Sequence, residues 1–230
     1  MRIWGVIPAA GVGKRYSSDI PKQYLPLNGI PVLLHSLYKF VKFDEIEEVL
    51  VALNPDDTFW PKLNFSHPKV KTIHGGSERC NSVNNALEEL SGRAENKDWI
   101  LVHDAVRPCI SDFDLKKIIG IVHNEDVGGL LACPILDTIK EVGDNLDVLK
   151  TIPREKLWSA MTPQIFRYGL LKKAMNAVLV AGRSVTDEAS AIELIGLTPR
   201  VVEGDKTNIK ITHQQDMVLA ESIINAWLNK

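Results

Sequence analysis

The stretch IWGVIPAAGVGKR, residues 3–15, places a run of apolar residues directly before a glycine-rich, cationic loop. Residues 3–7 do not alternate between apolar and polar side chains, which is typical of a strand buried on both faces. Similar runs predict strands at residues 3–7, 49–53, 70–73, 99–102, 130–133 and 200–202. Apolar residues at helical spacing accompany them at residues 32–41, 115–122 and 217–227. This pattern predicts an α/β fold with a mostly parallel sheet and helices on both faces.

The loop after the first strand matches neither of the two commonest phosphate-binding motifs. A P-loop needs a glycine at Pro8 and a Ser or Thr at Arg15, and a GxGxxG motif needs a glycine at Tyr16. Its small residues would still let the backbone approach an anion, with positive charge from Lys14, Arg15 and Lys22. We therefore predict a phosphate-binding loop, and a tight turn with solvated cations is the alternative.

The segment DTIKEVGDNLDVLKTIPREKLW, residues 137–158, breaks the alternation of strands and helices. Its short strand-like pieces flank a polar GDN turn, a pattern typical of a hairpin. A surface loop is one alternative, and a protruding arm used for association is at least as well supported. We expect one domain over residues 1–230, with a β-arm at about residues 137–158.

The composition indicates an ordinary soluble globular protein. The chain of 230 residues is 45% hydrophobic and 24% charged, with a formal net charge of -2. Because nucleic-acid-binding surfaces are usually strongly basic, we expect no nucleic-acid partner. No apolar run approaches the roughly 18 residues of a membrane helix, so we expect no membrane contact.

The cysteines and histidines form no recognisable metal or disulfide pattern. The three cysteines are far apart and include no CxxC pair, and the six histidines show no HxxxH or HExxH spacing. A protein-held zinc site therefore has little support. We expect a cytoplasmic protein whose cysteines, Cys80, Cys109 and Cys133, are unpaired and buried.

Three polar segments directly follow predicted strands. PAAGVGKR (residues 8–15) follows the first strand, HGGSER (residues 74–79) the third, and HDAVRP (residues 103–108) the fourth. In open α/β sheets, ligands bind outside the carboxyl ends of the strands. These segments are therefore the candidate walls of a ligand site.

Together with PKQYLPLNG, the opening loop resembles the nucleotidyltransferases that join a nucleoside triphosphate to a phosphorylated sugar or polyol. More narrowly, the chain is similar to the family of 2-C-methyl-D-erythritol 4-phosphate cytidylyltransferases of the non-mevalonate isoprenoid pathway. The resemblance covers nearly the whole length through motifs in this order: PAAGVGKR, PKQYL, HGGSERCNSV, VHDAVRP, DTIK, LWSAMTPQIF, TDEASAIE and VEGDKTNIKIT.

The resemblance implies a Rossmann-like fold, CTP and a polyol phosphate as substrates, Mg²⁺ bound mainly through the CTP phosphates, and a homodimer joined by the β-arm. It implies that CTP is wrapped by Pro8, Ala9, Ala10, Gly11 and Gly13, with Gly76, Ser77, Ser82, Asp104 and Ala105 at its cytosine and ribose end. The methylerythritol phosphate would be surrounded by Arg107, Thr138, Arg154, Thr162, Thr186 and Lys210. The family often has an acidic residue where this chain has Ser77, so a side-chain contact to the nucleotide would be lost or weakened there.

The implied reaction is attack by a phosphate-monoester oxygen on the α-phosphorus of CTP, with release of pyrophosphate. A monoester with a second pKa near 6 is mostly dianionic at pH 7, so no general base is required. The enzyme must instead bring two polyanions together and stabilise the charge of the transition state. The residues implied to be catalytic are Arg15 and Lys22 at the triphosphate, with Lys210 and Arg154 fixing the incoming phosphate.

Several of these residues also have ordinary structural explanations. Lys22 and Lys210 would be solvated lysines, and Asp104 and Thr186 would be helix caps. A carboxylate at a strand end is, however, also well placed for ribose or Mg²⁺.

Three other functions compete with this one. A ribitol 5-phosphate cytidylyltransferase shares the loop, HDAVRP and NIKIT, but WSAMTPQ and TDEASA favour methylerythritol phosphate. A non-catalytic nucleotide-binding regulatory protein would need only one ligand, whereas cations are implied at both substrates. A nicotinamide-dependent dehydrogenase is disfavoured because GxGxxG is missing.

Overall fold

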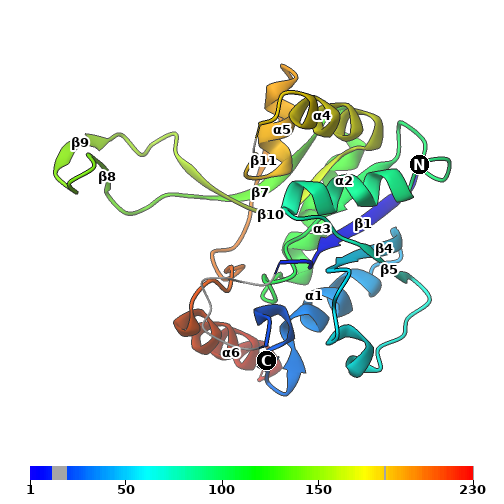
Figure 1. Ribbon diagram of the computed structural model, residues 1–230. Helices are drawn as coiled ribbons and strands as arrows, with labels where there is room; N and C mark the ends of the chain where they lie inside the picture. Colours follow the sequence, from blue (N-terminus) through cyan, green and yellow to red (C-terminus); the bar gives the residue numbers. More distant parts are fainter. Residues whose placement is uncertain (12–19, 184, 230) are drawn as a thin grey trace.

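The computed structural model describes residues 1–11, 20–183 and 185–229. Within them, a seven-stranded sheet has the strand order β11-β7-β10-β6-β1-β4-β5 (Figure 1). Its strands are β1 (Ile3–Pro8), β4 (Ile46–Leu53), β5 (Val70–His74), β6 (Trp99–Val102), β7 (Gly128–Pro134), β10 (Trp158–Arg167) and β11 (Arg200–Glu203). Neighbouring strands are parallel except that β10 runs antiparallel to β6 and β7. The predicted α/β fold with a mostly parallel sheet is confirmed.

Helices cover both faces of the sheet. Successive strand residues point to opposite faces, and here the side chains on both faces are apolar. Ile3 and Ile7 of β1 pack in one buried cluster with α1 (Val32–Val41) and α3 (Asp112–Gly120). Trp4 and Val6 pack in another with α2 (Arg79–Glu89), α4 (Tyr168–Val180) and α5 (Glu188–Leu194). The non-alternating apolar pattern of residues 3–7 is thereby explained.

The C-terminal helix lies in the lower part of the molecule in Figure 1. Helix α6 (Gln214–Leu228) packs through Ala220 and Ile224 on a third cluster that includes Leu27. Short elements are η1 (Lys22–Tyr24), η2 (Trp60–Leu63), η3 (Ile121–His123), β2 (Pro26–Leu27) and β3 (Ile30–Pro31). None of the helices within the described ranges has both the length and the apolar character that crossing a membrane requires.

Strand β10 is a central strand that the sequence pattern did not indicate. It carries Pro163, and proline is rare in central strands except at irregularities. Its pairing with β7 shifts register between Ala160 and Gln164, so the proline lies at such an irregularity. Polar Thr162 and Gln164 are buried there, which hides the strand from an apolar pattern.

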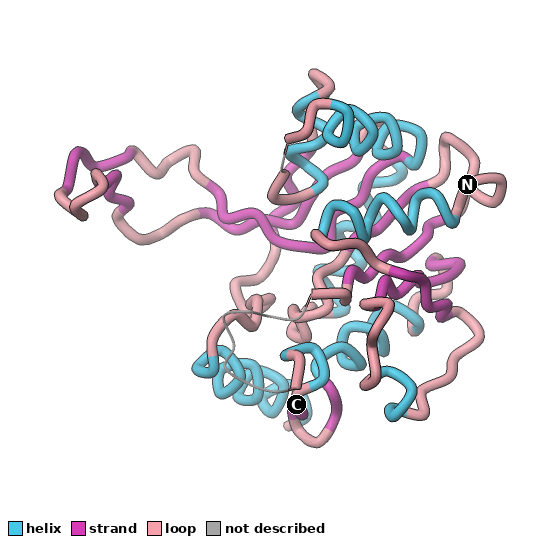
Figure 2. The backbone as a smooth tube through the Cα atoms, in the orientation of Figure 1, coloured by secondary structure: helices cyan, strands magenta, loops and turns pink. Residues whose placement is uncertain are grey.

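The predicted hairpin is present as a separate two-stranded sheet of β8 (Ile139–Val142) and β9 (Val148–Ile152). It extends away from the central sheet on the connection between β7 and β10 (Figures 1 and 2). It lies within the expected segment 137–158, whose last residue already begins β10. Between residue 136 and the end of β9, the exposed large apolar side chains are Leu136, Val142, Leu146, Val148 and Leu149.

Candidate active site

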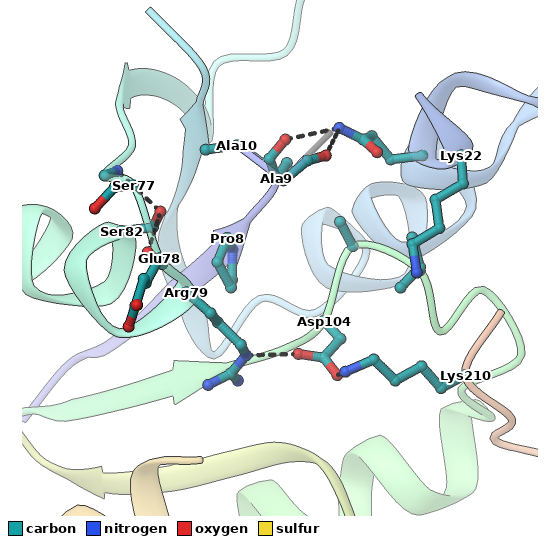
Figure 3. A pocket seen from close by; sticks show the side chains of 15 residues that line it. Pro8, Ala9, Ala10, Lys22, Ser77, Glu78, Arg79, Ser82, Asp104 and Lys210 are labelled. Carbon is teal, nitrogen blue, oxygen red and sulfur yellow. Dashed lines mark hydrogen bonds and ion pairs between the residues drawn. The ribbon is translucent and has the colours of Figure 1, made fainter. Parts of the chain in front are cut away.

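The three predicted strand-end segments meet at one cavity of about 300 Å³ (Figure 3). The chain adds β4 on one side of β1 and later β6 on the other, so the cavity lies at a point where the strand order reverses. Such switch points are the usual ligand crevices of open α/β sheets. The lining residues are Pro8, Ala9, Ala10, Gly11, Lys22, Gln23, Gly76, Ser77, Glu78, Arg79, Ser82, Asp104, Ala105, Val106 and Lys210.

The paired glycines let the chain leave the edge strand β5 and reach the loop after β1. The Gly75 N–H donates to the carbonyl of Leu53 at 2.6 Å, so the chain passes over the end of β4. A Cβ on Gly75 would lie 2.5 Å from the Cβ of Ala10, and one on Gly76 would lie 2.2 Å from that of Asn81. A larger residue at Gly75 would therefore push the two walls of the cavity apart, and one at Gly76 would push the turn away from α2.

Ser82 secures this glycine turn on the first turn of α2. Its hydroxyl accepts from the Gly76 N–H at 3.0 Å and donates to the Glu78 carbonyl at 3.2 Å. Ser77 lies exposed at the cavity. The side chain of the following residue, Glu78, also lines the cavity and accepts from the Cys80 thiol at 3.7 Å.

The start of the small-residue loop is held by Gln23, for which no role was predicted. Its buried Nε2 donates to the carbonyls of Ala9 and Gly11 at 2.9 and 3.0 Å. The neighbouring Lys22 lines the cavity, and its Nζ donates to the carbonyl of Ile211 at 3.0 Å. The element η1 thus places one side chain under the loop and one beside it.

Asp104, at the carboxyl end of β6, is surrounded by cations. Its Oδ1 accepts from Arg79 Nε at 2.8 Å, and its Oδ2 accepts from Lys210 Nζ at 2.9 Å, with Arg107 Nε 3.6 Å away. Burial by itself would raise the pKa of Asp104, but Arg79 and Lys210 hold that pKa well below its usual range. This carboxylate is therefore ionised at neutral pH and is a poor general base.

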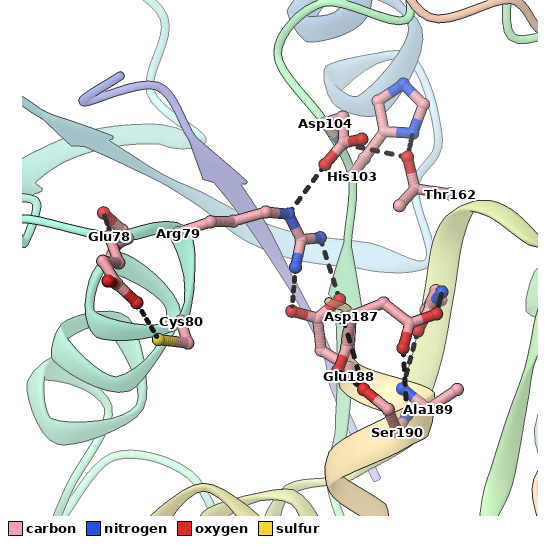
Figure 4. A network of polar contacts seen from close by, with 12 residues as sticks. Glu78, Arg79, Cys80, His103, Asp104, Thr162, Asp187, Glu188, Ala189 and Ser190 are labelled. Atoms are coloured by element: carbon pink, nitrogen blue, oxygen red, sulfur yellow. Dashed lines mark hydrogen bonds and ion pairs between the residues drawn. The ribbon is translucent and has the colours of Figure 1, made fainter. Parts of the chain in front are cut away.

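His103 and Thr162 fix the backbone of Asp104 from behind the cavity (Figure 4). His103 Nε2 lies 3.1 Å from the Arg107 carbonyl, which can only accept, so Nε2 carries the proton. The bare Nδ1 accepts from the Thr162 hydroxyl at 3.1 Å, and that hydroxyl accepts from the Asp104 N–H at 3.0 Å. The proton of the Thr162 hydroxyl is therefore already used inside the protein.

The other predicted substrate residues lie outside the lining of this cavity. Arg107 is packed behind Asp104, where its Nη1 donates to the Asn208 carbonyl at 2.7 Å. Thr138 and Arg154 are exposed at the base of the arm, where Arg154 donates to the Leu136 carbonyl. The structure therefore does not bring these arm residues to the cavity of their own subunit.

Thr186 is exposed just before α5, and it is not the cap of that helix. Asp187 is the N-cap instead, because its side chain accepts from the Ser190 N–H at 3.0 Å. The predictions for Gly13 and Arg15 fall outside the described residues.

Glu78, Arg79 and Val106 also line the cavity; they lie in the predicted wall segments, but no individual role was predicted for them. Arg79 had a recognisable signal. It is the first residue of α2, where the helix dipole disfavours a cation, so an arginine there indicates a carboxylate partner elsewhere in the fold.

Fold and site together define a class of protein. The cavity combines small-residue backbone with several cations, and its described lining residues include no pair of nucleophile and base. A polyanion that is itself the reacting group fits such a site, as in the nucleotidyltransferases.

One known family within this class matches the chain. The family described as IspD, 2-C-methyl-D-erythritol 4-phosphate cytidylyltransferase, matches residues 3–226. The chain belongs to this family. The 2-C-methyl-D-erythritol 4-phosphate cytidylyltransferase of Pseudomonas fluorescens (strain Pf0-1) is 45% identical over 229 residues, which is 99% of this chain and 96% of the relative.

Solved structures with the same printed name agree. The one from Francisella tularensis is 39% identical with a TM-score of 0.84, covering 97% of this chain and 100% of that one. The one from Thermus thermophilus is 29% identical with a TM-score of 0.81, covering 98% and 100%.

The activity predicted from the sequence is thereby confirmed. The chain carries out CTP-dependent cytidylyl transfer to 2-C-methyl-D-erythritol 4-phosphate in the non-mevalonate pathway. The ribitol phosphate, regulatory and dehydrogenase alternatives are set aside.

Proposed function

We propose that CTP occupies the cavity between β1 and β6, and that the phosphate of methylerythritol phosphate attacks the α-phosphorus there. The observation that carries this proposal is the convergence of three strand-end segments on a cavity that Lys22, Arg79 and Lys210 also line. A new bond forms between a phosphate oxygen and the α-phosphorus. The bond from the α-phosphorus to the bridging oxygen breaks, and pyrophosphate leaves.

The proposed binding mode follows the chemistry of the walls. The exposed backbone of the loop suits the phosphates, and Lys22 at its side suits the charge that develops on the leaving pyrophosphate. In this proposal CTP contacts Pro8, Ala9, Ala10 and Gly11, with Gly76, Ser77, Ser82, Asp104 and Ala105 at the cytosine and ribose end. Gly13 and Arg15 stay predictions for the same nucleotide.

The polyol phosphate would enter from the side of Lys210, and Arg107, packed behind Asp104, stays a predicted contact. Lys210 is 42% exposed, so it can turn from Asp104 toward an incoming phosphate. Thr186 stays a predicted contact. Thr162 would offer the polyol at most a lone pair, because its hydroxyl already donates its hydrogen bond to His103. Since the phosphate is already dianionic, these groups need only hold it in line with the α-phosphorus.

Mg²⁺ is the ion that the family implies, and the acidic residues of the cavity fit an ion carried by the nucleotide. In the ranges that the structure describes, no group of three or more His, Cys, Asp or Glu side chains could hold a metal ion. Mg²⁺ commonly uses one or two carboxylates together with substrate phosphates, and Asp104 retains free lone pairs for that purpose. When bound, the ion would neutralise charge on the phosphates.

We further propose that two subunits pair through the arm. The hairpin of β8 and β9 leaves the body of the molecule and exposes several apolar side chains, and an isolated hairpin is marginally stable in water. Thr138 and Arg154 at its base would then serve the cavity of the partner subunit. This arrangement would complete a site that one subunit leaves without those two residues.

A cytoplasmic location also stays a proposal. All three cysteines are free, with Cys80 and Cys109 buried and Cys133 partly buried. Unpaired cysteines suit a reducing compartment.

Pyrophosphate release tests the function directly. The purified protein with CTP and Mg²⁺ should release pyrophosphate when methylerythritol phosphate is added, and not when the polyol is omitted. The assay is run in parallel with ribitol 5-phosphate.

Ready release with ribitol phosphate and none with methylerythritol phosphate would contradict the substrate. CTP binding by calorimetry without release from either polyol would instead indicate a regulatory protein.

A further inference from the structure

Arg79 lines the cavity, yet its donors are directed at two carboxylates (Figure 4). Its Nε donates to Asp104 Oδ1 at 2.8 Å, while Nη1 and Nη2 donate to the two oxygens of Glu188 at 2.6 and 2.9 Å. The second contact is a fork-to-fork pair, the geometry that fixes a guanidinium in orientation as well as position. Arg79 therefore connects Asp104 rigidly to α5.

Glu188 is anchored as a base for this pair. It is 1% exposed, and among the described residues only Arg79 donates hydrogen bonds to its carboxylate. The start of α5 is itself fixed to β10, because Gln164 donates to Asp187 at 2.9 Å and accepts from the Ala189 N–H at 2.9 Å. The contacts thus run from β10 through α5 and Arg79 to Asp104.

Asp104 has a different kind of partner on its other oxygen. Lys210 is flexible and 42% exposed, whereas the Arg79 side chain is 26% exposed and fixed at three nitrogens. If Lys210 turns to the phosphate of the substrate, Oδ2 loses its closest partner. Oδ1 then keeps its bond to Arg79, which holds the carboxylate in place during the reaction.

We propose that Arg79 and Glu188 are positioning residues for Asp104, and that Glu188 keeps the terminal donors of Arg79 away from the triphosphate. This inference rests on the proposed function, in which Asp104 contacts the nucleotide or its metal ion and Lys210 contacts the incoming phosphate. Both residues act through Asp104 rather than on the substrates.

Substitutions in this pair should affect stability and activity differently. Arg79→Gln leaves Glu188 buried without a counter-charge, which is strongly destabilising. The double variant Arg79→Gln/Glu188→Gln removes both charges and should regain much of the stability. It still lacks the rigid donor to Asp104, so it should not regain the rate.

The experiment measures melting temperature, kcat, and KM for both substrates in wild type, Arg79→Gln, Glu188→Gln and the double variant. We expect Arg79→Gln to melt roughly 10 °C below wild type and the double variant to recover at least half of that loss. The kcat of the double variant should stay about 10- to 100-fold below wild type, the scale of a small misplacement in the active site. KM for CTP should change by less than kcat.

Arg93 and Glu48 provide a matched control, since Arg93 Nη2 lies 2.8 Å from Glu48 Oε2 near the other end of β4. Arg93→Gln/Glu48→Gln removes the same charges and should leave kcat within about twofold of wild type. If Arg79→Gln does not fold, the double variant alone decides, because its kcat is compared with that of the control at equal folded fraction.

Recovery of wild-type kcat in the double variant would show a purely structural pair and overturn the proposal. A rise in KM for CTP with kcat unchanged would show that the pair serves CTP binding alone, and would also overturn the proposal. Failure of the proposed function is distinct, because wild type itself would then release no pyrophosphate, and the positioning role would fall with it.

Discussion

At the scale of single residues, the site depends on neutral His103. The ring is fully buried, and its Nδ1 must stay unprotonated to accept the hydrogen bond that the Thr162 hydroxyl donates. Burial lowers the pKa of His103 from 6.5 to about 4, and this outweighs the attraction of neighbouring Asp104. A histidine that looks like a candidate base in the HDAVRP motif is therefore a structural group.

This histidine predicts how stability changes with pH. Between pH 6.5 and 4 the unfolded chain binds a proton at His103 that the folded chain does not, so stability falls as the pH is lowered. At full effect the loss is about 3 kcal/mol. The urea midpoint of wild type should fall over this window, and that of His103→Gln should fall much less.

Exposed His123 serves as the control, because His123→Gln should keep the slope of wild type. Equal slopes for wild type and His103→Gln would contradict the prediction. Asp104 does not confuse the measurement, since its lowered pKa affects stability only below about pH 4.

At the scale of elements, the short η1 supports the loop that is proposed to hold phosphate. Tyr24 anchors it, because its hydroxyl donates to Asp57 at 2.6 Å and its ring stacks on Phe59 at 5.4 Å. From that fixed position, Gln23 donates to two carbonyls of the loop. The PKQY segment thus holds the described start of the loop, residues 9–11, through hydrogen bonds.

Gln23→Glu should therefore weaken CTP binding. The substitution keeps the size of the side chain but replaces the two N–H donors with an acceptor that faces two carbonyls. Loss of these bonds should raise KM for CTP by roughly tenfold or more. Calorimetric titration with CTP measures the effect without turnover.

Gln214→Glu makes the same chemical change on the exposed start of α6 and should bind CTP like wild type. Unchanged CTP affinity in Gln23→Glu would show that the loop keeps its shape without this support.

At the scale of the whole molecule, the arm separates two sets of proposed substrate residues. Lys22 lies at the cavity, and Arg154 lies at the base of the projecting hairpin. In the proposed dimer, the two would meet in one site only if they come from different subunits. In a mixed dimer of a Lys22 variant and an Arg154 variant, one site should then contain both native residues and the other neither.

Mixing Arg154→Ala with Lys22→Ala should therefore regain part of the activity. Either variant alone should lose roughly 100-fold or more in kcat or in kcat/KM for methylerythritol phosphate, the scale of one preorganised charge. A mixed dimer assembles one site that carries both native residues. Pyrophosphate release is measured before and after subunit exchange.

Sedimentation gives the control, since a dimer is expected at the concentrations of the assay. An active monomer would rule out the shared site, as would a mixture that regains nothing after demonstrated exchange.

Local pattern determined much of this protein. Continuous apolar runs such as residues 3–7 and 99–102 became central strands, because burial on both faces leaves its record within a few residues. The GDN turn indicated the hairpin because turn preferences are also encoded within a few residues. The motifs at three strand ends indicated one cavity, since the carboxyl ends of parallel strands share an edge of the sheet.

Only the tertiary structure decided how the polar groups pair. Arg79 and Glu188 are 109 residues apart in the chain, and no local pattern records that α2 and α5 bring them together. The same holds for Gln23 beneath the loop and for β10, whose proline and buried polar residues conceal a central strand. Turn and burial preferences are encoded within a few residues, whereas the charge on Asp104 and the tautomer of His103 depend on neighbours that only the completed sheet supplies.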